Sequence, residues 1–321
     1  MKNKFIRYVN GCEWINKLVK YLDNIKINKR GTSLYQVGNE FVQDFERNDI
    51  IERAGGVAFN FTLAVFPAII FMITLIPYIQ QFFPEFSESN VMDFFSDVMP
   101  PSVFEAASYT LEDIMSHKRG GLLSLGAILA LYLSTNGMMS LIKAFNRCYR
   151  TRDNRGYFKT LLIATFLTII LSTTLFIAVI LLIIGQSTLQ NLKEMGLLTQ
   201  DYMYFAIVSI RFMVMIIIFL VSISTIFYVA PAVHDRWKFL SPGAVLATMC
   251  SILVSYSFSF YISNFGTYNK LYGSIGAMIA FMVWLFLISV IILTGFALNA
   301  SIDKANCKIQ KRKNISLSDY S

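Results

Sequence analysis

Apolar residues are gathered into six long runs along the chain, and polar stretches separate these runs. Each run is close to the length of about 20 residues that an α-helix needs to cross the hydrocarbon core of a bilayer. The pattern therefore predicts an all-α, polytopic integral membrane protein with six transmembrane helices. The predicted spans are Gly56–Gln80, Gly121–Ile142, Leu161–Gly185, Phe205–Ala230, Gly243–Ile262 and Tyr272–Ala300.

Helical spacing of apolar residues also occurs outside these runs. Residues 5–22 carry it, and residues 34–45 repeat it after Ser33 and Gln36, which are spaced as a capping box. We expect two amphipathic N-terminal helices with basic polar faces, lying on the inner leaflet or packed under the bundle. Between the first two spans, residues 81–120 show the same spacing around Pro100–Pro101 and predict an ordered, helical external loop.

Composition agrees with a membrane protein. Hydrophobic residues make up 55% of the chain and charged residues 15%, against about 25% charged residues in a soluble globular domain. The formal net charge is +8, but the positive residues flank the spans instead of forming one patch. Membrane orientation and anionic headgroups account for that distribution. Nucleic acid is therefore not an expected partner.

The basic residues alternate between the two sides of the predicted bundle. Residues 1–53 carry ten Lys and Arg, residues 143–159 carry six and residues 301–321 carry five, whereas residues 81–120 carry two beside seven acidic residues. The positive-inside rule then places both termini in the cytoplasm. The chain divides into cytoplasmic amphipathic helices at 1–53, a six-span bundle at 54–302 and a basic cytoplasmic tail at 303–321.

No pattern in the sequence indicates catalysis. The two histidines, His117 and His234, fall on opposite sides of the predicted membrane, and the four cysteines lack the spacing of metal ligands. The sequence contains no phosphate-loop, zinc-protease or hydrolase motif. We therefore expect no catalytic residue, no metal, no cofactor and no enzyme activity.

Polar residues inside the spans are costly in hydrocarbon, so they indicate either function or helix packing. Asn60, Asn136 and Asn299 fit both interpretations, because an amide can join two helices or line a path for a substrate. Arg211 either lies at the external headgroup level or faces an internal cavity. Pro67 removes a helical hydrogen bond and should bend the first span.

Small residues and a capping signal mark two further positions. Ser241 and Pro242 are spaced as the N-cap and first residue of the fifth span. Gly273, Gly276 and Ala280 put small residues on one face of the sixth span, which suits tight helix packing.

Four stretches carry a resemblance to a known family. They are RAGGVAFNFTLAVFPAIIF from Arg53, LIKAFNRCYR from Leu141, YVAPAVHDRWKFLSPGAVLA from Tyr228, and the segment from Tyr261 to Ala300. Over residues 35–302 the chain resembles the YihY/BrkB family of inner-membrane proteins, which has also been labelled ribonuclease BN-like.

The resemblance implies a six-span bundle in the bacterial inner membrane, and transport or flipping of lipid-linked envelope material has been proposed for some relatives. It adds Tyr272 to the candidates for translocation or helix packing. It also groups Asn146 with Arg53 and Arg147 as candidate contacts of anionic lipid. The chain departs from the family pattern at Asn60, where an aromatic residue is common. No residue supports the ribonuclease label.

We therefore predict a transporter or flippase for an amphiphilic, anionic envelope lipid or precursor. The alternative is a non-catalytic membrane scaffold for envelope proteins. Membrane lipids, and further copies of the chain in a homo-oligomer, are the expected partners. A polar cavity lined by Asn60, Asn136 or Arg211 would favour transport, whereas a dry bundle that pairs these side chains would favour the scaffold.

Overall fold

The computed structural model describes residues 20–26 without 22, 32–47, 49–79, 119–149, 153–194, 201–232, 238–264 and 266–318, with isolated positions between 80 and 118. Its named helices are α3 (Leu34–Arg47), α4 (Ile50–Ile79), α7 (Gly120–Tyr149), α8 (Tyr157–Glu194), α9 (Asp201–Val229), α10 (Pro242–Asn264) and α11 (Gly266–Ser318). Six of these are long and apolar enough to cross a membrane. The predicted all-α, six-span class is confirmed.

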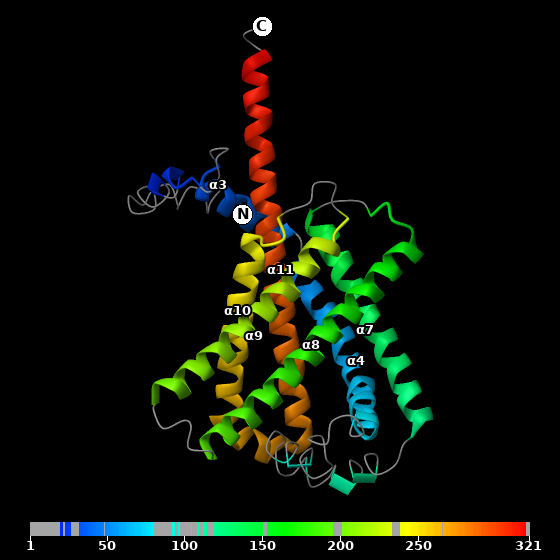
Figure 1. Cartoon of the computed structure of the whole chain (residues 1–321). Helices are drawn as coiled ribbons and strands as arrows, with labels where there is room; N and C mark the ends of the chain where they lie inside the picture. The colour runs from blue at the N-terminus through cyan, green and yellow to red at the C-terminus, as the bar shows by residue number, and fades with distance from the viewer. Residues whose placement is uncertain are drawn as a thin grey trace.

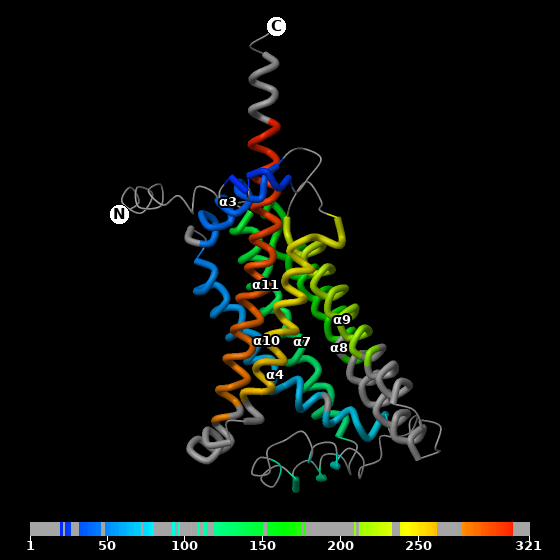
Figure 2. The backbone as a smooth tube through the Cα atoms, turned by 90° about the vertical axis from the view of Figure 1, so that its left-hand side faces the viewer, coloured from blue at the N-terminus to red at the C-terminus, as the bar shows by residue number. Residues whose placement is uncertain are grey.

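The six long helices form one elongated bundle with α3 lying across one end (Figure 1). We call this end the basic end: α4, α8 and α10 begin there, and α7 and α9 end there. α11 packs against α3, α4, α7 and α10 and is therefore the central helix. Beyond the bundle it continues past α3 as a projecting rod (Figures 1 and 2).

α3 begins at the capping box that the sequence predicts. The Gln36 N–H donates to Ser33 Oγ at 3.2 Å, and the Ser33 N–H donates to Gln36 Oε1 at 3.4 Å. Val37 on this helix is buried, and Phe41 and Phe45 pack against the core. Of the two positions that the sequence allowed, α3 takes the one packed under the bundle. The other predicted amphipathic helix and the ordered loop at 81–120 lie almost entirely outside the described residues.

α10 begins as predicted at Ser241 and Pro242. Ser241 Oγ accepts a hydrogen bond from the Ala244 N–H at 3.3 Å, and its carbonyl accepts one from the Val245 N–H at 3.1 Å. Pro242 has no N–H to leave unpaired at the first helical position. The sequence therefore fixes the basic end of α10 locally.

Two helices differ from the simple spans read from hydropathy. α4 stays helical through Pro67 and Pro77, and Figure 2 shows its lower part turning away from the line of its upper part. α11 runs from Gly266 to Ser318, well past the predicted end at Ala300. The apolar run ends near Ala300, but no glycine or proline follows to stop the helix.

Three aromatic rings form the centre of the core near the basic end. Phe145 of α7 stacks on Phe296 of α11 with ring centroids 4.1 Å apart, and Phe227 of α9 meets both rings edge-on at 5.6 Å. All three side chains are buried. This aromatic trio joins three helices that come from distant parts of the chain.

Burial is distributed unevenly along α8–α11. In α8, α9 and α10, every described side chain that is buried lies in the part next to the basic end: residues 160–168, 223–227 and 243–251 respectively. In α11, none of the described side chains at 278–288 is buried. α4 and α7 differ, because Gly126 of α7 still packs closely against the backbone of Phe71 farther from the basic end. The described side chains of α8–α10 are therefore tightly packed at the basic end and loosely packed away from it, whereas α4 and α7 also pack closely farther along.

The aromatic trio should be a major source of stability. Replacing Phe296 by Ala leaves a cavity among three helices and should lower the free energy of unfolding by about 3 kcal/mol. Phe166→Ala is the matched control, because the Phe166 side chain is 54% exposed on α8. Thermal midpoints in a mild detergent should fall clearly for Phe296→Ala alone. Equal midpoints for the two variants would contradict the central place of the trio.

Candidate functional site

A very close helix contact near the basic end joins α10 to α11. A Cβ built on Gly243 would lie 2.0 Å from the Gly295 carbonyl oxygen, and one on Gly295 would lie 2.6 Å from the Gly243 oxygen. Asn299, which is buried, fixes this contact: its Oδ1 accepts from the Gly243 N–H at 2.8 Å, and its Nδ2 donates to Ser241 Oγ at 2.7 Å. Asn299 therefore serves as a polar pin between the two helices.

A cluster of hydrogen-bonded polar residues joins the ends of α7 and α9 to the connection before α8. Arg155 Nε and Nη2 donate to the Asp153 carboxylate at 2.8 and 2.9 Å, and Nη2 also donates to the Ala230 carbonyl at 3.0 Å. Asn146 donates to Asp153 at 2.8 Å and accepts from the Ala232 N–H at 2.8 Å. We call these residues the polar junction.

The Asp153 carboxylate is held in its charged form. Hydrogen bonds from the Arg155 side chain are the largest influence and lower its pKa below the ordinary 3.8, with Asn146 adding to the effect, while partial burial opposes it. A lowered pKa means that Asp153 stabilises the fold above its unfolded pKa and loses that contribution as the pH falls through the folded value. The polar junction is therefore intact at neutral pH.

A third set of contacts holds α3 against the extended part of α11. Lys304 Nζ donates to Asp44 Oδ2 at 2.6 Å and to the Cys148 carbonyl at 3.1 Å. Asp44 is buried, and Ser301 Oγ lies 3.5 Å from its carboxylate. Lys308 also pairs with Glu40 of α3, and Thr32, just before α3, bonds to Asn306. Tyr149, at the end of α7, bonds to Asp303 of α11.

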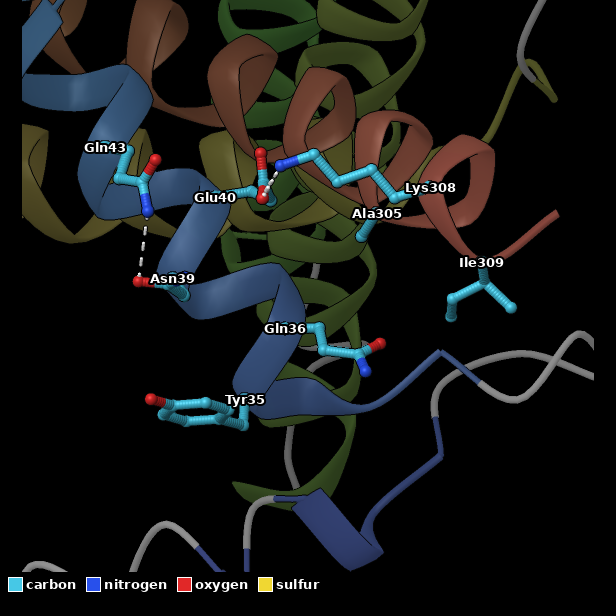
Figure 3. A pocket seen from close by; sticks show the side chains of 8 residues that line it. All are labelled: Tyr35, Gln36, Asn39, Glu40, Gln43, Ala305, Lys308 and Ile309. Atoms are coloured by element: carbon cyan, nitrogen blue, oxygen red, sulfur yellow. Dashed lines mark hydrogen bonds and ion pairs between the residues drawn. The ribbon is translucent and has the colours of Figure 1, made fainter. Parts of the chain in front are cut away.

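A polar pocket of about 250 Å³ lies beside this contact. Figure 3 shows α3 along one wall, with Asn39 hydrogen-bonded to Gln43, and the Glu40–Lys308 pair reaching across to α11. Tyr35, Gln36, Ala305 and Ile309 complete the lining. Among the residues that the structure describes, no three His, Cys, Asp or Glu side chains are grouped as a metal site requires.

The predicted polar residues of the spans do not gather in one place. Asn60 Nδ2 donates to the Gly56 carbonyl at 2.8 Å and to Ser140 Oγ of α7 at 3.0 Å, so it joins α4 to α7. Asn136 is half-buried on α7, and Pro67 is half-buried on α4. The side chains of Arg211 and Tyr272 lie outside the described residues.

The three predicted lipid contacts have different surroundings. Arg147 is exposed and Arg53 is half-buried. Asn146 is buried, and both ends of its amide are used within the polar junction. Sequence reasoning missed Asp153, Arg155 and Lys304, for which no local pattern is a signal. It also missed Asp44, although an acidic residue close to the apolar positions Phe41 and Phe45 of α3 was a signal that could have identified it.

Comparison with known proteins connects this geometry to a family. The sequence model of the family described as Virulence factor BrkB matches residues 41–316. The chain belongs to this family. The matched range contains Asp44, the polar junction, Asn299 and Lys304, and the match confirms the resemblance predicted from the four sequence stretches.

Individual relatives of this BrkB-family chain are bacterial proteins. It is 32% identical over 258 residues to the ribonuclease-like protein YfkH of Bacillus subtilis, covering 78% of this chain and 90% of YfkH. It is 22% identical over 251 residues to a UPF0761 membrane protein of Tolumonas auensis, covering 78% and 79% of the two chains. Its identity to the UPF0761 membrane protein XCV0968 of Xanthomonas euvesicatoria is 25% over 293 residues, 89% of this chain and 64% of the relative. No solved structure matches the chain.

The contact between α10 and α11 should not tolerate a methyl group. Gly243→Ala forces the two backbones apart and should cost about 3 kcal/mol of unfolding free energy. Gly56→Ala is the control, because a Cβ at Gly56 meets nothing within 4 Å and alanine favours the helix. Thermal midpoints in detergent should drop for Gly243→Ala and stay level or rise for Gly56→Ala. A Gly243→Ala protein as stable as the wild type would refute the close contact.

The polar junction should contribute equally across the neutral range. Asp153→Asn removes charge-assisted hydrogen bonds and should lower the free energy of unfolding by about 1–2 kcal/mol. Because the pKa of Asp153 is below 3.8, the difference in thermal midpoint between wild type and Asp153→Asn should be constant from pH 8 to pH 5. A difference that disappears by pH 6 would show that Asp153 is not held in its charged form.

Proposed function

We propose that this BrkB-family membrane protein is a transporter or flippase for an amphiphilic, anionic envelope lipid or lipid precursor. It would act in the bacterial inner membrane with both termini in the cytoplasm, so that the basic end faces the cytoplasm. The chain carries no nucleotide-binding motif, so movement would be passive or coupled to an ion.

The uneven burial of α8–α11 is the observation that carries this proposal. A protein that moves a substrate across a membrane must be closed on one side of the substrate while it is open on the other. The bundle is sealed at the basic end by the aromatic trio, the α10–α11 contact and the polar junction. Away from that end, the described side chains of α8–α10 are half-buried or exposed.

Charge at the basic end supports an anionic substrate. Lys143, Arg147 and Lys159 are exposed beside the ends of α7 and α8, where each basic residue near a membrane surface attracts anionic lipid by about 1 kcal/mol. They would concentrate anionic headgroups around the sealed end. Arg53 at the start of α4 would add to this field.

We also propose that the chain is not a nuclease, although its relative YfkH is described as ribonuclease-like. Three acids at the basic end are already paired with basic residues: Asp44 with Lys304, Asp153 with Arg155 and Glu40 with Lys308. Carboxylates neutralised in this way are poorly placed to hold the metal ions on which hydrolytic enzymes of nucleic acid commonly depend.

A membrane scaffold is the second candidate, and two hydrogen-bonded asparagines favour it. Asn60 and Asn299 both join helices, as expected if polar groups serve packing alone. α3 and the projecting part of α11 would then form the platform that partner proteins bind. A protein that binds partners through this platform and moves no lipid would support the scaffold.

Lipid movement in proteoliposomes tests the two candidates. Purified protein should accelerate the crossing of a fluorescent phosphatidylglycerol more than that of a matched phosphatidylcholine, because the basic end attracts anionic headgroups. The Lys143→Gln, Arg147→Gln, Lys159→Gln triple variant should reduce the anionic rate at least fivefold, because each lost charge alone removes about 1 kcal/mol of attraction for an anionic headgroup. Lys308→Gln, on the extended part of α11, is the control and should leave the rate unchanged. No protein-dependent movement of any tested lipid would reject the transporter.

A further inference from the structure

Three buried hydroxyl groups near the basic end have no hydrogen-bond partner. Ser224 of α9 and Thr248 and Ser251 of α10 are at most 1% exposed, and none of the three hydroxyl oxygens is paired. Ser224 lies six residues before Ala230, and Thr248 and Ser251 lie seven and ten residues after Ser241. At a rise of 1.5 Å per residue, all three lie about 9–15 Å in from the basic end.

Other buried hydroxyls, on the neighbouring helices α4, α8 and α11, behave differently. They donate to the carbonyl four residues earlier at 2.7–2.8 Å, as Thr62, Thr168, Ser289 and Ser301 do. A buried polar group without a partner destabilises the state that buries it. The packing of α9 and α10 observed here therefore carries an unfavourable contribution that ordinary helix packing would avoid.

The polar junction, in contrast to the unpaired hydroxyls, stabilises the observed packing of α9. α9 packs along α8 and α10, and its contact with α7 at the basic end runs through the Phe227 ring and the hydrogen bonds to Ala230 and Ala232. These bonds are made by Arg155 and Asn146 with Asp153 between them, so they hold the end of α9 against α7. α8 and α9 run obliquely to α4 and α7 (Figure 1) and pack against each other, while α8 also contacts α7 and α9 contacts α10.

We propose that the basic end is a gate with two states. The polar junction is the latch that holds it closed, and the three unpaired hydroxyls favour opening because water would reach them once the packing of α9 and α10 in the bundle loosens. Opening would begin with the separation of Arg155 from the Ala230 carbonyl and of Asn146 from the Ala232 N–H. This inference rests on the proposed transport function, in which the sealed end must open to complete a cycle.

Alkylation of a cysteine at position 224 tests the gate without measuring transport. The native cysteines are replaced by alanine, Ser224→Cys is introduced, and the full-length protein is placed in lipid nanodiscs with a water-soluble maleimide. The thiol should react slowly, because Ser224 is completely buried. Asp153→Asn, which weakens the latch, should raise the alkylation rate at least tenfold.

Removing the unpaired hydroxyls should have the opposite effect and stabilise the closed state. Thr248→Val with Ser251→Ala removes two unpaired hydroxyls, so the closed state should gain stability, the thermal midpoint should rise, and alkylation at position 224 should slow at least threefold. Thr168→Val is the matched control: its hydroxyl is bonded to the Ala164 carbonyl, so its loss should not slow alkylation. If Asp153→Asn does not fold, as judged by elution on gel filtration, the hydroxyl variants decide alone.

Equal alkylation rates in the parent, the hydroxyl variant and any folded latch variant would overturn the gate. Lipid movement measured on the same proteins separates the two proposals. Lipid movement with unchanged alkylation rates would reject the gate and retain the transporter. Altered alkylation rates without any lipid movement would retain the two-state opening and reject transport.

Discussion

The near-contact of the α10 and α11 backbones at Gly243 and Gly295 is the constraint on which the basic end depends. Lipid tails are as apolar as the helix surfaces, so helices in a membrane associate through close packing and hydrogen bonds more than through the hydrophobic effect. Two glycines permit the approach, and the Asn299 amide fixes its register by bonding the backbone of Gly243 and the cap at Ser241. This contact thereby sets the position of α11 along its axis relative to α10, and the other contacts of α11 depend on that position.

The remaining contacts of α11 extend from this point in both directions. Phe296, one residue beyond Gly295, enters the aromatic trio and brings in α7 and α9. One to two turns farther along, Ser301 and Lys304 meet Asp44 and hold α3 across the end of the bundle. The central helix α11 therefore brings α3, α4, α7, α9 and α10 together at the basic end, where the buried side chains of α9 and α10 lie.

Sequence reasoning recovered the features that depend on local pattern. Hydropathy located all six spans, and the spacing of Ser33 with Gln36 and of Ser241 with Pro242 located two helix starts, because a cap involves residues within one turn. The same reasoning reached Asn299 as a polar residue but not its partners. The Asp44–Lys304 pair joins residues 260 positions apart, and no local pattern contains that pairing.

Two other features show what local sequence patterns do not predict. The length of α11 was underestimated because hydropathy reports where lipid contact ends, whereas the helix continues along α3. Arg155 was counted among the flanking basic residues, although its guanidinium is satisfied by Asp153 and the Ala230 carbonyl. The positive-inside pattern counts charges and is blind to their partners. Asn60, an open question in the sequence, joins α4 to α7.

In the proposed transporter, the bundle is closed at the basic end and open away from it. Distances between pairs of spin labels in lipid nanodiscs test this most directly, with one pair at Arg147 and Phe239 near the basic end and another at Leu125 and Tyr261 toward the opposite end. The account predicts a narrow distance distribution for the first pair and a broad one for the second. Equally narrow distributions at both ends, or a broader one at the basic end, would contradict it.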